Sequence, residues 1–135
     1  MPILTELACR LWPEHTQEEM VWDLGEIIAK PDAAFFLASS GGEYVGFAQC
    51  QLRRDYVEGT EHSPVGYLEG IYVAEAYRRQ GLAGKLLSEC ESWSKSKGCA
   101  EFASDCELHN TRSLQFHLNV GFEEANRIIC FVKKI

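Results

Sequence analysis

The sequence lacks long apolar runs, paired cysteine motifs and an excess of basic residues, and each absence excludes a class of protein. No stretch of about 18 apolar residues occurs, so no membrane partner or membrane-spanning helix is expected. Residues 1–6 lack the basic, apolar and small-residue order of a signal peptide, which predicts a cytoplasmic protein. The net charge of −7 argues against nucleic acid as a partner and favours a cationic one.

Two cysteines separated by two residues, the spacing typical of metal and redox sites, do not occur in this chain. The six cysteines are scattered, at positions 9, 50, 90, 99, 106 and 130, among apolar or helical neighbours. We therefore predict reduced, buried thiols that pack as small hydrophobic side chains, and no metal site. Repeats and linkers are also lacking, and 135 residues predict one domain spanning residues 1–135.

The stretch from Leu68 to Lys97 carries the strongest signal in the sequence. It reads as a strand, a basic turn containing Gly81 and Gly84, and a helix with an apolar stripe. Neither a P-loop nor the glycine pattern of dinucleotide-binding folds is present. What remains is Arg78-x-x-Gly81-x-Ala83, which places free backbone N–H groups at a helix start and predicts a phosphate or pyrophosphate site. An ordinary capped surface helix is the alternative.

Periodicity and turn residues predict alternating helices and strands, and therefore the α/β class. The predicted helices span residues 3–12, 17–29, 82–97 and 110–120, with Gly98 as a C-terminal cap of the third. The predicted strands span residues 35–38, 44–52, 66–73, 100–104 and 128–132, with Gly41-Gly42 as a hairpin turn between the first two. Residues 53–63 are predicted to form a loop.

The turn resembles the pyrophosphate signature of the GNAT acyltransferases, and a second motif strengthens the resemblance. The chain reads Asn110-Thr111-Arg112-Ser113 and ends that helix before Gly121-Phe122, in the order of the family. The resemblance implies the GNAT (acyl-CoA N-acyltransferase) fold, a central mixed sheet flanked by helices. The first strand of the family has no counterpart before Ile3, so the chain is truncated, or this edge strand is lost or supplied by a neighbour. Because an open strand edge invites pairing, we expect a homodimer or a protective device there.

Within the GNAT family the chain is similar to the aminoglycoside 6'-N-acetyltransferases, on residues 63–73, 101–105 and 121–124 and on shorter matches near residues 12 and 56. The resemblance implies a resistance enzyme that transfers acetyl from acetyl-CoA directly to the 6'-amine of an aminoglycoside antibiotic, in a ternary complex. The alternatives are the same acetyltransferase chemistry on another cationic amine, such as a polyamine, and a non-catalytic acyl-CoA-binding module.

Three residues are predicted to be catalytic, each with a structural alternative. Glu69 lies among hydrophobic residues of a strand, where Gly70 allows a bulge that re-aims it, and serves either as a base toward the amine or in an internal ion pair. Asp105 ends a neighbouring strand and acts there or in a helix cap. His117 replaces the tyrosine of the family and either protonates the departing thiolate, donates a hydrogen bond, or packs in the core.

The resemblance also implies the binding residues. Those implied for the aminoglycoside are Trp12, Tyr56, Glu69 and Asp105. Those implied for acetyl-CoA are Ile71, Tyr72, Val73, Arg78, Arg79, Gln80, Gly81, Leu82, Ala83, Gly84, Lys85, Asn110, Ser113, Phe116 and His117, with N-capping as the alternative role of Asn110. The family carries an acidic residue shortly after Gly-Phe-Glu-Glu, and this chain has Asn126 at that position. One negative charge expected at the substrate site is therefore absent.

Overall fold

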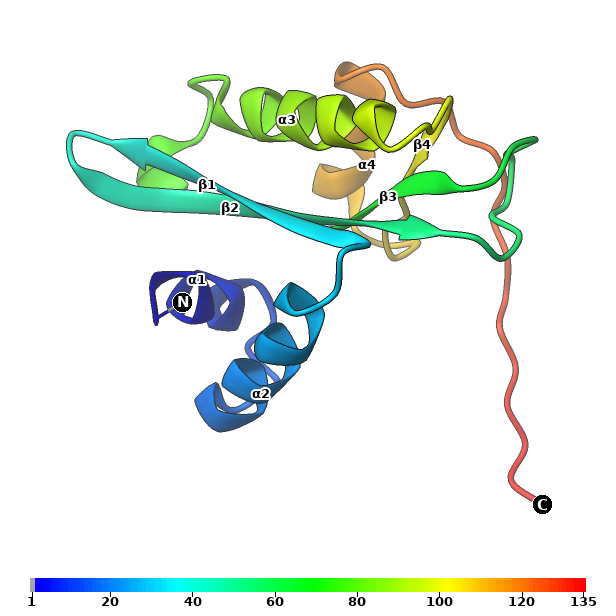
Figure 1. Ribbon diagram of the computed structural model, residues 1–135, viewed down its shortest axis with the longest axis horizontal. Coiled ribbons are helices and arrows are strands. Elements are labelled where there is room, and N and C mark those ends of the chain that lie inside the picture. The colour runs from blue at the N-terminus through cyan, green and yellow to red at the C-terminus, as the bar shows by residue number, and fades with distance from the viewer. Residues whose placement is uncertain (1) are drawn as a thin grey trace.

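A four-stranded sheet forms the centre of the computed structural model, which describes residues 2–135 (Figure 1). The strands β1 to β4 lie side by side in the order of the sequence. The pairs β1–β2 and β2–β3 are antiparallel, whereas β4 runs parallel to β3, so the sheet is mixed as predicted. Their bounds are β1 (Ala33–Ser40), β2 (Glu43–Arg53), β3 (Val65–Val73) and β4 (Phe102–Ala103).

Helices cover both faces of this sheet. The helices α1 (Pro2–Leu11) and α2 (Gln17–Ile28) lie on one face, and α3 (Leu82–Ser96) and α4 (Thr111–Asn119) lie on the other (Figure 1). Alternation along β2 explains the layers, because successive strand side chains point to opposite faces. Phe47 packs against α1 and α2, while Ala48 and Cys50 pack with buried residues of α3. The α/β class and the helix-flanked sheet are therefore confirmed.

The turns follow the predicted glycines. Gly41 and Gly42 adopt positive φ angles of 57° and 84° and close the β1–β2 hairpin, a conformation that favours glycine. Gly98, with φ of 92°, follows the end of α3, and its N–H donates to the carbonyl of Lys95. Between β3 and α3 lies a short 3-10 turn, η1 (Glu75–Tyr77). No helix among residues 2–135 is long and apolar enough to cross a bilayer.

Three sequence predictions are wrong in whole or in part for this chain. Residues 128–132 form no strand, because no strand of the described chain lies beside them; they run outward, exposed, after α4 (Figure 1). The predicted strand over residues 100–104 shortens to Phe102–Ala103, since only these two residues pair with β3. All six cysteines are free, as predicted, but only three are buried: Cys50, Cys90 and Cys99. Cys9 and Cys106 are half-buried, and Cys130 is exposed in the outward segment.

A bulge interrupts the pairing of β2 with β3 at the predicted position. Gln49 pairs with Gly70 and Cys50 pairs with Leu68, so Glu69 is the extra residue on β3. A bulge bends the strand and turns the side chain of the extra residue out of the regular alternation. The bulge expected at Glu69 and Gly70 is therefore present.

Candidate active site

Strands β3 and β4 pair over two residues and then separate. Gly66 pairs with Phe102 and Tyr67 with Ala103, whereas β3 continues to Val73 with no further β4 partner. Burial changes at the same point, from buried residues 65–68 to half-buried residues 69–72. Between residues 68 and 73 the N–H and C=O groups that point away from β2 therefore have no strand partner within residues 2–135. Because such groups require hydrogen bonds, this opening suits a ligand that lies along the strand.

The N-terminus of α3 lies beyond the end of β3. Gly81 precedes the helix with φ of 79°, and no side chain of the described residues caps the helix start. A Cβ built at Gly81 or Gly84 meets no described atom within 4 Å, so the approach to the first-turn N–H groups is open. Uncapped N–H groups and the positive end of the helix dipole favour an anion, so this helix start is here called the anion site; phosphate binding there stays a prediction.

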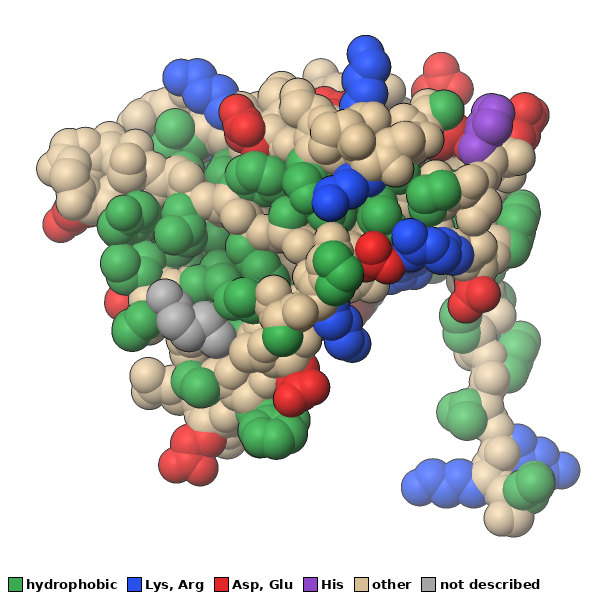
Figure 2. Space-filling view, viewed as in Figure 1, with side chains coloured by type: hydrophobic (Ala, Val, Ile, Leu, Met, Phe, Trp, Pro, Cys, Tyr) green, Lys and Arg blue, Asp and Glu red, His purple; other side chains and the backbone are tan. Residues whose placement is uncertain are grey.

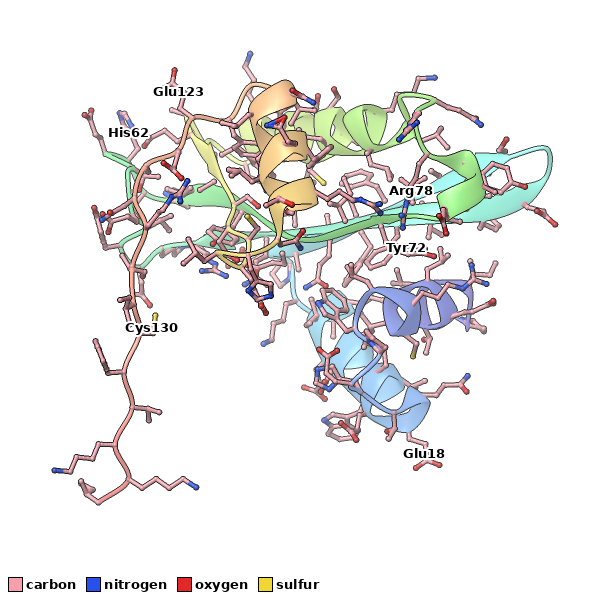
Figure 3. All side chains as sticks on the ribbon, turned by 180° about the vertical axis from the view of Figure 1, so that it is seen from behind. Glu18, His62, Tyr72, Arg78, Glu123 and Cys130 are labelled. Atoms are coloured by element: carbon pink, nitrogen blue, oxygen red, sulfur yellow. The ribbon has the colours of Figure 1, made fainter. Side chains whose placement is uncertain are left out.

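Two basic residues shape the turn before α3. The Nε atom of Arg78 donates to the carbonyl oxygen of Val73 at 2.7 Å, which ties the turn to the end of β3. Figure 3 shows Arg78 next to Tyr72, and the guanidinium carbon lies 5.9 Å from the centre of that ring. Arg79 adopts a positive φ of 66° and is exposed. Both charges lie in the turn that leads to the anion site.

The two predicted carboxylates belong to two hydrogen-bonded pairs linked by a cation–π contact, together called the acidic network. Arg53 donates to the Glu69 carboxylate from Nε at 3.0 Å and from Nη2 at 2.7 Å. The same guanidinium lies 3.5 Å above the centre of the Tyr67 ring, and the Tyr67 hydroxyl donates to Asp105. The Arg53–Glu69–Tyr67–Asp105 network thus joins the end of β2, the bulge of β3 and the residue beyond β4.

Two members of the acidic network, Tyr67 and Arg53, have pKa values above their usual range. Burial, followed by the hydrogen bond to Asp105, raises the pKa of Tyr67, so its phenol remains a donor. Hydrogen bonds to Glu69 raise the pKa of Arg53, so its guanidinium remains a cation. The side chain of Glu69 is 16% exposed. The site already binds one cation between a carboxylate and an aromatic face.

Trp12 lies beside the bulge, against Gly70; its part in substrate binding, implied by the family resemblance, stays a prediction. A Cβ added at Gly70 would lie 2.6 Å from the Trp12 ring, so only glycine permits this packing. Trp12 also packs edge-on against Phe47, with centroids 6.0 Å apart. Tyr56, in contrast, is 76% exposed on the β2–β3 loop, and its predicted part in binding stays a prediction.

His117 contacts a serine that the sequence analysis missed. Its Nδ1 lies 2.7 Å from the carbonyl oxygen of Ser113, which can only accept, so Nδ1 carries the hydrogen. In the neutral ring Nε2 is then an acceptor, and it lies 2.8 Å from the hydroxyl of Ser104. The ring also packs against Phe116 and Phe122. With this tautomer, the neutral ring does not donate from Nε2; donation there requires the imidazolium.

Asn110 begins α4 as an N-cap. Its side-chain oxygen accepts a hydrogen bond from the N–H of Ser113 at 3.1 Å, which is the structural alternative foreseen for this residue. Ser113 and Phe116 lie on the same helix and both contact His117. Their predicted contacts with a coenzyme stay predictions.

Sequence reasoning could have found one of the missed residues. Tyr67 lies two residues before Glu69 on the same predicted strand, so it is a near neighbour in the sequence. Arg53 and Ser104 lack such a signal, because only strand register and the path of the chain after β4 bring them to Glu69 and His117. Among residues 2–135 no three His, Cys, Asp or Glu side chains gather as metal ligands would.

Comparisons with known proteins agree with this geometry. The profile of the Acetyltransferase (GNAT) family matches residues 1–122. Aminoglycoside N(6')-acetyltransferase type 1 of Serratia marcescens is 42% identical over 130 residues, covering 96% of this chain and 89% of that protein. The Salmonella typhimurium protein of the same name is 40% identical over 95% of this chain and 88% of its own length.

Solved structures with high similarity include two aminoglycoside acetyltransferases. AAC(6')-Iy in complex with the bisubstrate analogue CoA-S-monomethyl-acetylneamine has a TM-score of 0.95 and 38% identity, over 99% of this chain and 91% of that one. The apo structure of AAC(6')-IG from Acinetobacter haemolyticus has a TM-score of 0.95 and 38% identity, over 99% of this chain and 92% of that one.

Replacing Tyr67 with Phe removes the hydroxyl that donates to Asp105 and keeps the ring under Arg53. We expect the free energy of unfolding at pH 7 to fall by about 1–2 kcal/mol, as for a lost hydrogen bond to a charged group. Above about pH 10 the Tyr67 phenol ionises in the unfolded chain but not in the folded one, so the wild type loses stability. The difference in unfolding free energy between the wild type and Tyr67→Phe therefore becomes smaller there.

Urea unfolding at pH 7 and at about pH 10.5 measures both effects. Tyr56→Phe is the control, and it should change neither value because Tyr56 is exposed. An advantage of the wild type over Tyr67→Phe that widens at high pH would contradict the raised pKa of Tyr67.

Proposed function

This chain belongs to the acetyltransferase (GNAT) family, and we propose that it transfers acetyl from acetyl-CoA to the 6'-amine of an aminoglycoside antibiotic. The acidic network beside the β3–β4 opening carries the proposal. Its carboxylate and aromatic ring already hold the guanidinium cation of Arg53, next to strand backbone that has no strand partner within residues 2–135. Relatives named as aminoglycoside N(6')-acetyltransferases match over about the whole chain, and the bisubstrate complex of AAC(6')-Iy joins both ligands in one site.

The anion site and the opening fit the two ends of acetyl-CoA. First-turn N–H groups of α3, with Arg79 and Lys85 nearby in the sequence, suit its diphosphate. The N–H groups of Ile71, Tyr72 and Val73 that point away from β2 suit its pantetheine arm and polarise the carbonyl of its thioester. The thioester supplies the activated acyl carbon. The chain therefore holds its acyl donor mainly through backbone groups.

The acidic network receives the amine. An aminoglycoside ammonium can approach Glu69 and Asp105 as Arg53 does, with aromatic surface from Trp12 nearby. A protonated amine is no nucleophile, so one carboxylate, directly or through a water, removes its proton before attack. Glu69 fits this role because its side chain is largely buried and turned by the bulge.

The departing thiolate needs a proton. His117 in its imidazolium form can deliver one from Nε2 through the hydroxyl of Ser104, 2.8 Å away. The carbonyl of Ser113 fixes the ring in the required orientation. His117 and Ser104 therefore form a short proton relay that runs from α4 to the residue directly after β4.

Cellular context follows from the same activity. Acetylation of an aminoglycoside removes a cationic amine, which fits a role in antibiotic resistance, and acetyl-CoA as donor fits a cytoplasmic enzyme. We also place the enzyme as a homodimer, because the described sheet is open at β1 and β4 and open edges pair readily.

A panel of amines tests the substrate class. We expect release of free CoA with kanamycin, tobramycin and neomycin, and at least about 100-fold lower kcat/KM with spermidine, which lacks the rings that aromatic surface contacts. Paromomycin is the matched control for neomycin, since a hydroxyl replaces its 6'-amine, and should react slowly.

Each other outcome favours a different function. Turnover with spermidine alone favours a polyamine acetyltransferase. CoA binding without turnover of any amine favours a non-catalytic acyl-CoA-binding module. Equal rates with neomycin and paromomycin would refute the 6' position.

Replacing Glu69 with Gln tests the proposed base. We expect kcat/KM for the aminoglycoside to fall by about 10²–10⁴, mainly in kcat, with KM for acetyl-CoA unchanged. Glu18→Gln is the control: Glu18 is exposed on α2, on the outer side of the helical layer in Figure 3, and its replacement should leave kcat/KM unchanged. A rise in KM alone would assign Glu69 to binding, and wild-type rates would remove it from the site.

Replacing Gly84 with Asp tests the anion site. A carboxylate in the first turn of α3 favours the helix dipole, so stability should hold or rise, while repulsion of phosphate weakens CoA binding by at least about 100-fold. Ser92→Asp, exposed on the same helix, is the control and should bind CoA as the wild type does. Calorimetry measures binding; unchanged affinity of Gly84→Asp would refute this placement.

A further inference from the structure

Glu101 holds the β2–β3 loop, residues 54–64, with a single carboxylate oxygen. Its Oε1 atom lies 2.9 Å from the backbone nitrogen of Glu61, 2.8 Å from that of His62 and 2.8 Å from Nδ1 of the His62 ring, which Figure 3 shows on this loop. An ionised carboxylate only accepts hydrogen bonds, so all three nitrogens donate. These three contacts are here called the Glu101 clamp, and no step of the proposed reaction uses them.

The sheet fixes Glu101 in turn. Its carbonyl oxygen accepts from the N–H of Gly66 at 3.1 Å, and the next residue, Phe102, pairs with Gly66 as β4 begins. The hydrogen bond from the Glu61 N–H, followed by the one from the His62 ring, lowers the pKa of Glu101, so the carboxylate stays charged in mild acid. Hydrogen bonds to a charged acceptor are about twice as strong as neutral ones. The Glu101 clamp therefore ties the end of the loop to the sheet.

The β2–β3 loop lies against the acidic network. Val57, in the middle of the loop, is 9% exposed and packs with Val65 and Tyr67. Tyr67 is the residue whose hydroxyl donates to Asp105. Tyr56 comes directly before the buried Val57 and is 76% exposed, so the conformation of the loop sets where its ring lies.

The exposed side chains of the loop suit a cation. Asp55, Glu58 and Glu61 are exposed, and Figure 2 shows acidic side chains at the surface of this end of the molecule. Carboxylates attract ammonium groups, and the face of an aromatic ring attracts cations. A substrate gains fully from these groups only when the loop is already ordered, because ordering a segment on binding costs conformational entropy.

We propose that Glu101 is a positioning residue for the amine substrate, because its carboxylate holds the β2–β3 loop in the conformation that borders the acidic network. The role rests on the proposed function, in which an aminoglycoside binds at that network. Glu101 acts through the loop, which contacts the amine substrate, whereas the acyl donor binds along β3 and at the start of α3. Loss of the Glu101 clamp therefore weakens binding of the aminoglycoside and leaves the binding of acetyl-CoA unchanged.

Replacing Glu101 with Ala removes all three hydrogen bonds. We expect KM for kanamycin to rise by at least about 10-fold, because the substrate must then order the loop as it binds. We expect kcat to change by less than about 2-fold and KM for acetyl-CoA to stay the same. Glu101→Gln keeps an acceptor oxygen without the charge, and His62→Ala removes one hydrogen bond of the three, so each should raise KM for kanamycin by less than Glu101→Ala does.

Glu91→Ala is the matched control, since Glu91 is an exposed glutamate of α3 outside the Glu101 clamp. It should leave all three kinetic constants unchanged. A merely structural role for Glu101 predicts less folded enzyme, hence a lower apparent kcat with KM for kanamycin unchanged, and that result overturns the proposal. A larger rise in KM with His62→Ala than with Glu101→Ala also overturns it, because the ring itself would then contact the substrate.

Two measurements separate this role from the proposed function. In the wild type without ligands, the amide protons of Glu61 and His62 should exchange slowly, and in Glu101→Ala they should exchange at least about 10-fold faster. Equal exchange in the two proteins overturns the positioning role and leaves the proposed function intact. Calorimetry with kanamycin, on protein saturated with CoA, gives the other outcomes. Equal affinity for both proteins overturns the positioning role alone, whereas no binding to the wild type overturns the proposed function and this role with it.

Discussion

The site depends on how far two parallel strands stay together. β3 and β4 pair at Gly66 and Tyr67 and then separate. Gly66 closes this end tightly, because a Cβ there would lie 2.3 Å from the Ser94 hydroxyl of α3 and 2.7 Å from the Phe102 ring. Past this point the edge of β3 faces the opening, and the same opening lies between the bulged Glu69 and the residues that follow β4.

Electrostatics gives the opening its selectivity. Glu69 is never an unpaired buried carboxylate, since Arg53 holds it from two nitrogens. In the proposed site, an incoming ammonium would exchange one ion pair for another, which costs less than burying a lone charge. The Tyr67 ring under Arg53 adds an aromatic face that suits any cation in this place. A negative chain then favours the approach of polycationic substrates.

The predictions from sequence succeeded where the signal is local. The glycine turn at 41 and 42, the cap at Gly98 and the bulge at Glu69 depend on residues adjacent in the chain, and each is present. The uncapped start of α3 also follows from the turn around Gly81. Residues 128–132 read as a strand for an equally local reason, but a strand requires a neighbour, and this chain supplies none within residues 2–135.

Sequence by itself thus determined the α/β order and the family signature, because periodicity, turn residues and short motifs are encoded over a few positions. The catalytic roles of Glu69 and Asp105 stay predictions. Only the tertiary structure decided that Arg53 pairs with Glu69, that the Tyr67 hydroxyl donates to Asp105 and that the Ser104 hydroxyl contacts His117. These contacts join residues 13 to 38 positions apart, and strand register and helix packing, which no local pattern specifies, set which side chains meet.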